Sequence, residues 1–229
     1  VAVSVDGELV FVWSDAAEQL TENSGGILAY SVKSQAISRV LADLHVLDCV
    51  TSPDPQMPHA FAIAAQDPTL YGIPLDTLQA YPTRLDLPHW TYPAALAISG
   101  EGRTLFLVTA DADCNLTLVV LEREGQEWRK GQTLPLYRAA QSGGLLLRST
   151  PDGASLFLAD TTGALVRVIR RQDALYVLSP TSIPGDLGVR DLAILPDGAT
   201  AYVLTMSKVS SSDVVTGSTI RVVDVATLS

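Results

Sequence analysis

Three observations predict that this chain is all-β and consists of one unit repeated five times. An acidic tight turn is followed at an offset of five by an aromatic residue, as in Asp6-Gly7 with Phe11 and Asp152-Gly153 with Phe157. The acidic positions of the five copies are separated by 48, 47, 51 and 45 residues. Each copy carries several short apolar runs, and helical periodicity is nearly absent. Four short strands in a repeat of roughly 40 to 50 residues are typical of a β-propeller blade.

The first two strands of each copy are expected to form a hairpin across the acidic turn. In the third copy an apolar run at 94–99 leads into Glu101-Gly102, and a β-rich run follows at 104–109. The turn needs glycine because glycine adopts a positive φ at little cost. The acidic side chain is interpreted as a cap for backbone N–H groups of the turn.

The third strands are apolar runs that follow a loop of variable length, and some copies continue with a more polar fourth strand. The third strands are expected at 27–32, 70–75, 116–121, 164–169 and 219–225, and fourth strands at 128–134 and 174–178. The loops between the second and third strands are expected to be longest at 15–25 and 206–217.

The remaining copies keep the pattern with one exception. Glu101-Gly102 precedes Phe106 and Asp197-Gly198 precedes Tyr202, but the second copy reads Pro53-Asp54-Pro55 before Phe61 and has lost its glycine. The aromatic residue alternates with small or polar neighbours on the second strand, so it is expected to fill the space between adjacent blades.

The five copies predict a single β-propeller domain over residues 1–229. The expected blades are 1–42, 43–88, 89–137, 138–184 and 185–229. The last unit shows no fourth strand after 219–225. Either five blades close the ring, or the chain is part of a larger propeller. An open blade edge would offer unpaired backbone groups for oligomerisation or for strand addition by a partner.

The last copy carries a family resemblance. Its run Leu-Ala-Ile-Leu-Pro-Asp-Gly-Ala-Thr-Ala-Tyr-Val-Leu-Thr at 192–205 resembles the repeats of YVTN and lactonase-like β-propellers, and 220–225 is similar to a WD40 strand without its tryptophan. These families include sugar-lactone hydrolases, subunits of quinoprotein dehydrogenases and many surface proteins, and most lactonase-like members have more than five blades. The resemblance implies an extracellular or periplasmic location.

Composition excludes several classes of function. The net charge of −10 argues against a nucleic-acid partner, because phosphates would be repelled over most of the surface. The apolar runs are far shorter than the roughly 20 residues that span a bilayer, so no membrane insertion is expected. The two cysteines, Cys49 and Cys114, fall in different blades and at different repeat positions, which favours free thiols over a disulfide.

One loop predicts a possible cation site. Asp111, Asp113 and Asn115 are spaced so that alternate side chains face the same point, and their oxygens would suit calcium. The run lacks the glycine and the distal glutamate of a specific calcium loop. The alternative interpretation is ordinary turn chemistry. No other cofactor is expected.

The connections between blades supply the candidates for catalysis. Asp86 and His89 lie with two aromatic residues before the third blade, and Arg138 and Arg190 occupy comparable positions in later copies. A carboxylate, an imidazole and arginines around a channel mouth would suit water activation and oxyanion stabilisation on a lactone. The alternative is that His89 packs at a blade junction. The two interpretations differ in whether the four side chains converge on one pocket.

The sequence is compatible with three functions. The sequence favours a non-enzymatic scaffold or binding module that presents its loops to a protein or carbohydrate partner, because no Gly-x-Ser-x-Gly elbow or phosphate loop is present. The first alternative is a lactonase-like hydrolase that uses Asp86 or Asp111 as base. The second is an accessory subunit of a redox complex.

Overall fold

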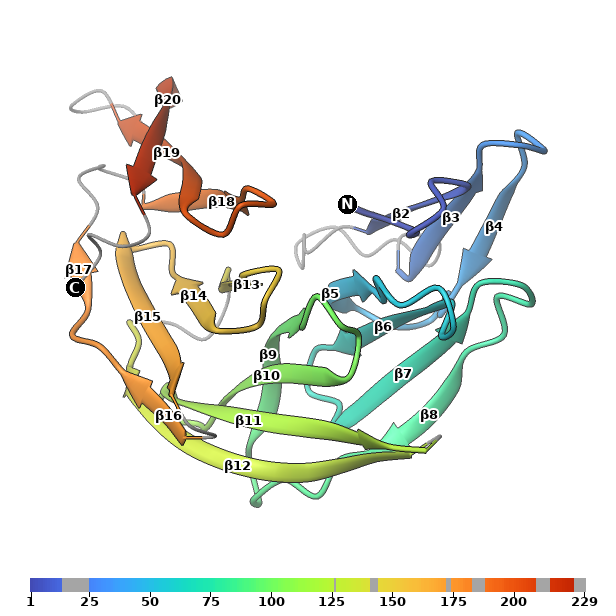
Figure 1. Cartoon of the computed structure of the whole chain (residues 1–229), viewed down its shortest axis with the longest axis horizontal. Helices are drawn as coiled ribbons and strands as arrows, with labels where there is room; N and C mark the ends of the chain where they lie inside the picture. The colour runs from blue at the N-terminus through green and yellow to red at the C-terminus, as the bar shows by residue number, and fades with distance from the viewer. Residues whose placement is uncertain are drawn as a thin grey trace.

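The all-β prediction is confirmed. The computed structural model describes residues 1–13, 25–125, 127–140, 144–171, 174–182, 188–208 and 215–224, and these contain strands and turns but no helix. The strands form five antiparallel sheets that are arranged as blades around a common axis, which is a five-bladed β-propeller (Figure 1). None of the described residues belongs to a helix long and apolar enough to cross a membrane.

The first three blades have four strands each, in sequence order from the centre outward. Blade 1 contains β1 (Ala2–Val3), β2 (Leu9–Trp13), β3 (Ile27–Ser31) and β4 (Ile37–Val40). Blade 2 contains β5 (Val46–Thr51), β6 (His59–Ala64), β7 (Thr69–Pro74) and β8 (Tyr81–Arg84). Blade 3 contains β9 (Tyr92–Ile98), β10 (Thr104–Ala110), β11 (Asn115–Glu124) and β12 (Glu127–Arg138).

The last two blades depart from this pattern. Blade 4 contains β13 (Leu146–Ser149), β14 (Ser155–Ala159), β15 (Ala164–Arg171) and β16 (Ala174–Val177), and β17 (Thr181–Ser182) also pairs with β15. Blade 5 contains β18 (Val189–Ile194), β19 (Thr200–Lys208) and β20 (Val215–Asp224). Within the described residues β20 is therefore an unpaired edge.

The repeated acidic turn is built as expected. Gly7, Gly102, Gly153 and Gly198 all have φ between 66° and 72°, and each donates its N–H to the carbonyl three residues earlier. The carboxylate of Asp152 accepts hydrogen bonds from the N–H of Ala154 and from the Thr150 hydroxyl. The Thr150 hydrogen bond is the main reason why the pKa of Asp152 lies below its usual value.

The loop of the last blade is shorter than expected. β19 continues to Lys208 and β20 begins at Val215, and these two residues pair, so the ends of the expected loop at 206–217 are strand. Residues 209–214 and most of the expected loop at 15–25 lie outside the described residues. The two cysteines are not bridged: Cys49 is buried in β5 and Cys114 lies in the turn before β11.

The repeated aromatic residue forms the core between blades. Phe11, Phe61, Phe106 and Phe157 are at most 1% exposed. Phe11 packs with residues of blade 2, and the next three pack against blades 3, 4 and 5 in turn. Tyr202 is the equivalent residue of blade 5, because it pairs with Ala193 as Phe106 pairs with Ala97. Its side chain is 38% exposed.

Packing between neighbouring blades runs through their innermost strands. β1 and β2 contact β5, β5 contacts β9, β9 contacts β13, and β13 contacts β18. Among the described residues no comparable packing joins blade 5 to blade 1, and the ring is open between β18–β20 and β2–β4 (Figure 1).

Candidate functional site

A cavity of about 300 Å³ lies on the axis, and all five blades contribute to its wall. Leu47, Ala94 and Arg190 reach it from equivalent places, because each is the extra residue of a β-bulge in an innermost strand. A bulge re-aims the side chains of the strand. The repeat therefore places one bulge residue from each of blades 2, 3 and 5 in the cavity wall.

Asp48 follows the first of these bulges and is the most deeply buried carboxyl group of the cavity. Its carboxylate accepts hydrogen bonds from the N–H of Cys49 (2.9 Å) and from the N–H of Leu96 in the next blade (3.0 Å). Burial raises the pKa of Asp48 to about 6, although the positive charge of Arg148 and the two N–H groups oppose the rise. A buried carboxyl group with such a pKa can accept or donate a proton near neutral pH.

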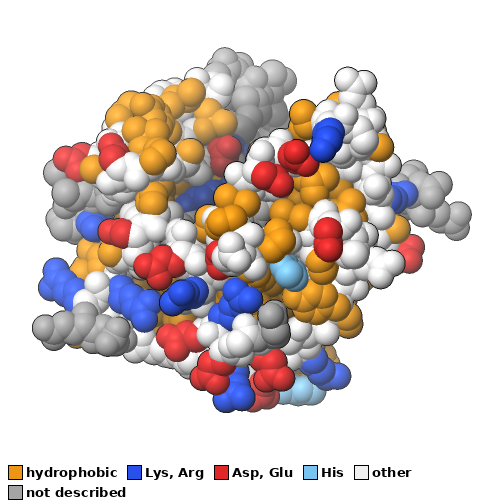
Figure 2. All heavy atoms as spheres, turned by 45° about the vertical axis from the view of Figure 1, so that its right-hand side comes forward, with side chains coloured by type: hydrophobic (Ala, Val, Ile, Leu, Met, Phe, Trp, Pro, Cys, Tyr) orange, Lys and Arg blue, Asp and Glu red, His pale blue; other side chains and the backbone are white. Residues whose placement is uncertain are grey.

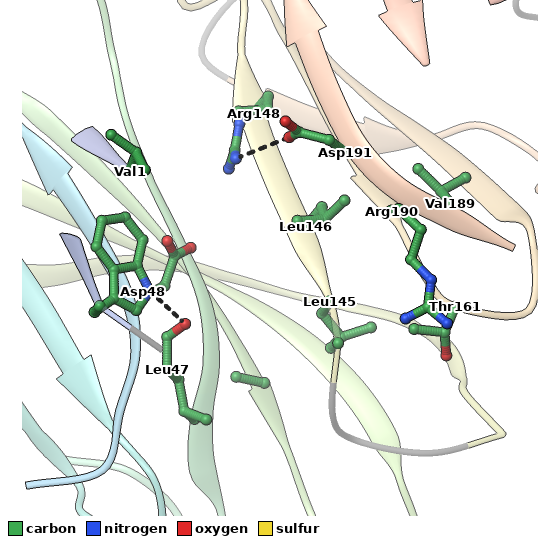
Figure 3. Close-up of a pocket in the computed structure, with 13 residues that line it drawn as sticks. Val1, Leu47, Asp48, Leu145, Leu146, Arg148, Thr161, Val189, Arg190 and Asp191 are labelled. Atoms are coloured by element: carbon green, nitrogen blue, oxygen red, sulfur yellow. Dashed lines mark hydrogen bonds and ion pairs between the residues drawn. The ribbon is translucent and has the colours of Figure 1, made fainter. Parts of the chain in front are cut away.

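Arg148 enters the same cavity from β13. Its Nε donates to the carbonyl of Leu192 (3.1 Å), and its Nη2 lies 3.7 Å from the carboxylate of Asp191 (Figure 3). Asp191 follows the bulge in β18, so it is the blade 5 equivalent of Asp48. Arg148 thus links blade 4 to blade 5 near the axis through a hydrogen bond and an ion pair. Arg190 and Thr161 line the same cavity (Figure 3).

A second cavity of about 250 Å³ continues along the axis. Its wall shares Asp48 and Arg148 with the first cavity, so these two side chains mark the junction between the two. Thr51 and Ser149 also line it, and their hydroxyl groups donate to the carbonyls of Val3 and Ile98 in the preceding blades. These two hydroxyls occupy equivalent positions in β5 and β13, and each forms a hydrogen bond between neighbouring blades.

The four residues predicted for catalysis lie in different places. Asp86 and His89 line a cavity of about 360 Å³ at the junction of blades 2 and 3. Arg190 lines the central cavity. Arg138 lines neither of them, and its Nε donates to the backbone carbonyl of Asp113 (3.0 Å). No single cavity holds all four, and a catalytic role for any of them stays a prediction.

The predicted cation loop is a hydrogen-bonded turn. The carboxylate of Asp111 accepts hydrogen bonds from the N–H of Asp113, from the N–H of Asn115 and from the side-chain amide of Asn115, each 2.9 Å long. The Asn115 side chain is the main cause of a lowered pKa of Asp111. Among the described residues no three His, Cys, Asp or Glu side chains gather as a metal site. Calcium binding here stays a prediction.

Sequence reasoning missed Asp48, Arg148 and Asp191. All three lie within apolar first-strand runs, where a single charged residue matches no recognisable motif. The available signal was the repeat itself: Asp48 and Asp191 each stand four residues before the residue that opens the turn, Ser52 and Leu195. A carboxylate at the same inward-facing position in two blades indicates a polar axis.

Comparison with solved structures places the fold among the propellers. Over 98% of this chain and 62% of the other, it matches Kuenenia stuttgartiensis hydrazine synthase with a TM-score of 0.70 at 15% identity. It matches a periplasmic gluconolactonase from Pseudomonas aeruginosa over 97% of this chain and 72% of that one, with a TM-score of 0.61 at 21% identity. A putative 6-phosphogluconolactonase from Bacteroides uniformis gives 0.59 at 14% identity, over 95% and 70%.

These likenesses concern the fold alone, because every identity is low. No protein-family model matches the sequence, and no curated protein is significantly similar to it. The chain spans 62% of the length of the hydrazine synthase chain and 70% to 72% of the two lactonase chains. The neighbours thus agree with a propeller resemblance that includes lactonase-like proteins.

Proposed function

We propose that this protein is a non-enzymatic propeller scaffold that binds a β-sheet of a second polypeptide segment between its first and last blades. The observation that carries this proposal is the exposure of one apolar face on each of those two blades. Large exposed apolar patches on water-soluble domains mark surfaces that bind other proteins. The YVTN and lactonase-like resemblance of the repeat fits such a scaffold without requiring catalysis.

The free face of blade 5 consists of Tyr202, Leu204, Ile220 and Val222. Tyr202 pairs with Val222 and Leu204 pairs with Ile220, so all four side chains point to the same side of the sheet. Ile220 and Val222 are 67% and 65% exposed. The opposite side of the same sheet packs against blade 4 through buried Ala201 and Val203. One side of the sheet therefore packs against blade 4 and the other is exposed, although both are apolar.

The free face of blade 1 has the same character. Val12 pairs with Leu28, and Tyr30 pairs with Ile37, so these four side chains share one side of the sheet. All four are exposed, and the opposite side buries Phe11 and Ile27 against blade 2. Hydrophobic side chains also gather at the surface in the upper part of Figure 2, whereas charged ones are densest over the lower half.

The lengths of the two lactonase neighbours support a partner of blade-like size. The parts of those chains that this chain does not match amount to about 90 residues each, from coverages of 70% and 72%. That is close to twice the 48-residue repeat. A segment of that size would form about two more four-stranded sheets.

Light scattering of the purified chain tests this proposal. We expect the apolar faces to make the chain self-associate above its 24.3 kDa mass and to bind a hydrophobic dye. The double variant Ile220→Lys with Val222→Lys should restore the monomer mass and reduce dye binding. The matched control is Tyr176→Lys, which changes a 51% exposed residue on an outer strand of blade 4 and should alter neither result. A native chain that stays monomeric and binds no dye would contradict the proposal.

A lactonase-like activity is the second candidate, and the central cavity favours it. Asp48 would take a proton from the attacking water in its ionised form, and Arg148 would stabilise the negative oxygen that develops on the lactone carbonyl. Because its pKa is about 6, such a base would act above that pH. Gluconolactone hydrolysis by the native chain, lost in Asp48→Asn at pH 7, would establish this activity and overturn the non-enzymatic proposal. No hydrolysis above the uncatalysed rate would remove the candidate.

An accessory subunit of a redox complex would be a special case of the scaffold. Such a subunit also binds a second polypeptide, and no residue of this chain takes part in chemistry. The fold likeness to hydrazine synthase supports it only at the level of the fold.

A further inference from the structure

Trp90 is exposed and has an unfavourable backbone conformation. The N–H of Thr91 donates to the carbonyl of Pro88, so Trp90 is the third residue of a tight turn, and its φ is +61°. Glycine or asparagine is favoured at such a position. The indole is 66% exposed and contacts the His89 ring edge to face at 4.7 Å. Strain of this kind concentrates at binding sites.

The other two tryptophans show what a structural role looks like in this fold. Trp13 donates its indole N–H to the carbonyl of Leu47, and Trp128 packs edge to face on Phe61 at 5.2 Å. Within the described part of the chain, the indole N–H of Trp90 has no protein acceptor. Trp90 therefore presents both a ring face and a hydrogen-bond donor to solvent.

Two cavities flank Trp90 on the face formed by the loops of blades 2 and 3. One encloses about 530 Å³ and the other about 360 Å³, and both are lined by Gln66, Trp90 and Tyr92. The larger cavity also shares Leu47 and Ala94 with the central cavity. The central cavity therefore adjoins the larger of these two cavities, and the larger adjoins the smaller. Trp90 lies between the larger and the smaller one. We call this series of cavities the loop-face groove.

We infer that the loop-face groove binds a neutral oligosaccharide, with one sugar ring stacked on Trp90. A pyranose ring has an apolar side of C–H groups and a rim of hydroxyls. The negative π-face of an indole attracts such C–H groups, and the polar rim needs donors and acceptors at the side. The cavity volumes lie in the range of small-ligand sites.

The polar groups that the hydroxyl rim requires are present. Gln66 and Asp86 are exposed, and Arg84 lines the same cavity as Asp86. Within the described residues, the side chains of these three pair with no other protein group. An amide, a carboxylate and a guanidinium together can donate to and accept from several hydroxyl groups. Because both charge signs occur at the same end of the groove, a neutral ligand fits better than a charged one.

An extended peptide fits this groove less well than an oligosaccharide. Peptides that add to a sheet need an unpaired strand edge. Here the turn backbone groups are already used, since Cys114 donates to Asp111, Asp111 donates to Asn115 and Thr91 donates to Pro88. Recognition in the groove must therefore rely on side chains, which suits stacking and hydroxyl contacts.

Calorimetric titration of the full chain with cellotriose, maltotriose, triacetylchitotriose and xylotriose tests this inference. We expect at least one trisaccharide to bind saturably with a Kd of about 1 mM or tighter, and Trp90→Ala to weaken that binding by about tenfold or more. Tyr176→Ala is the matched control, because it removes an exposed aromatic side chain from blade 4 and should leave the affinity unchanged.

A second variant separates binding from folding. Trp90→Gly should raise the Tm by about 2–4 °C, because glycine accepts the positive φ, and should still abolish binding. If no trisaccharide binds, or if Trp90→Gly binds as tightly as the native chain, the inference is overturned. The lysine variant of Ile220 and Val222 should bind sugar normally, so this result and the scaffold proposal can fail independently.

Discussion

Phe157 and Tyr202 occupy the same position in consecutive repeats, yet one is fully buried and the other is 38% exposed. Both follow an acidic turn by five residues, and both pair with the innermost strand in the same register. The difference is that Phe157 faces blade 5, whereas no described strand faces Tyr202. At these two positions, burial is therefore determined by the neighbouring blade and not by the local sequence.

Truncating these two rings should have very different costs in stability. Phe157→Ala should lower the free energy of unfolding by about 3–5 kcal/mol, because it leaves a cavity between two packed blades. Tyr202→Ala should cost about 1 kcal/mol or less, because its face is partly solvated already. Urea unfolding monitored by circular dichroism measures both values. Equal costs would mean that Tyr202 is covered in solution.

A second comparison concerns the two equivalent carboxylates Asp48 and Asp191. Asp48 is buried and its side chain accepts an N–H from the following blade, whereas the Asp191 side chain is 64% exposed. Burial raises the folded-state pKa of Asp48 from 3.8 to about 6. The folded protein therefore holds this proton more tightly than the unfolded chain, and the contribution of Asp48 to stability is greatest below pH 4 and is lost as the pH rises through 6.

This linkage should cost roughly 2–2.5 kcal/mol between pH 4 and pH 8, since each unit of pKa difference is worth about 1.4 kcal/mol and part of the effect is already lost at pH 4. Urea unfolding across that range should show a loss of this order in the native chain and in Asp191→Asn, but not in Asp48→Asn. A pH profile that Asp48→Asn leaves unchanged would assign the dependence to other groups. In Arg148→Met, carbon NMR should find the pKa of Asp48 higher still, because the Arg148 charge lowers it.

The hydroxyl groups that bond neighbouring blades should contribute little to stability. Thr51 and Ser149 each donate to a carbonyl of the preceding blade, while the equivalent residues Ile98 and Ile194 cannot. Thr51→Val should therefore cost about 0.5–1.5 kcal/mol, and Ile98→Val, which removes no hydrogen bond, should cost a comparable or smaller amount through packing alone. A double-mutant cycle of Thr51→Val with Ser149→Ala should be additive, since the two bonds lie at different blade junctions.

The repeat made most of the fold predictable from sequence. The turn, the aromatic residue and the apolar runs recur at fixed offsets, and each reflects a local requirement: positive φ at Gly153, a filled space at Phe157, a buried strand at β15. Tyr202 was the exception, because its exposure depends on what stands beyond the last sheet. Local sequence contains no information about that neighbour.

The candidate sites were less predictable than the fold. Asp86 and His89 line the same cavity because they lie within four residues of each other in one connection. Arg138 and Arg190 belong to other blades, and the angles between blades place them elsewhere. Asp48 and Arg148 meet at the junction of the two axial cavities although 100 residues separate them. Only the arrangement of several blades around one axis brings such residues together.

Carbene footprinting with mass spectrometry shows whether the faces of blades 1 and 5 are free, because the reagent labels apolar side chains that solvent reaches. In dilute native protein, the peptide that contains Ile220 and Val222 should be labelled strongly and the one that contains Leu28 and Tyr30 to an intermediate extent, relative to urea, while the peptide with Phe157 should be protected. Protection of all three peptides in a monomer would contradict that expectation, because both faces would then be covered within the chain itself.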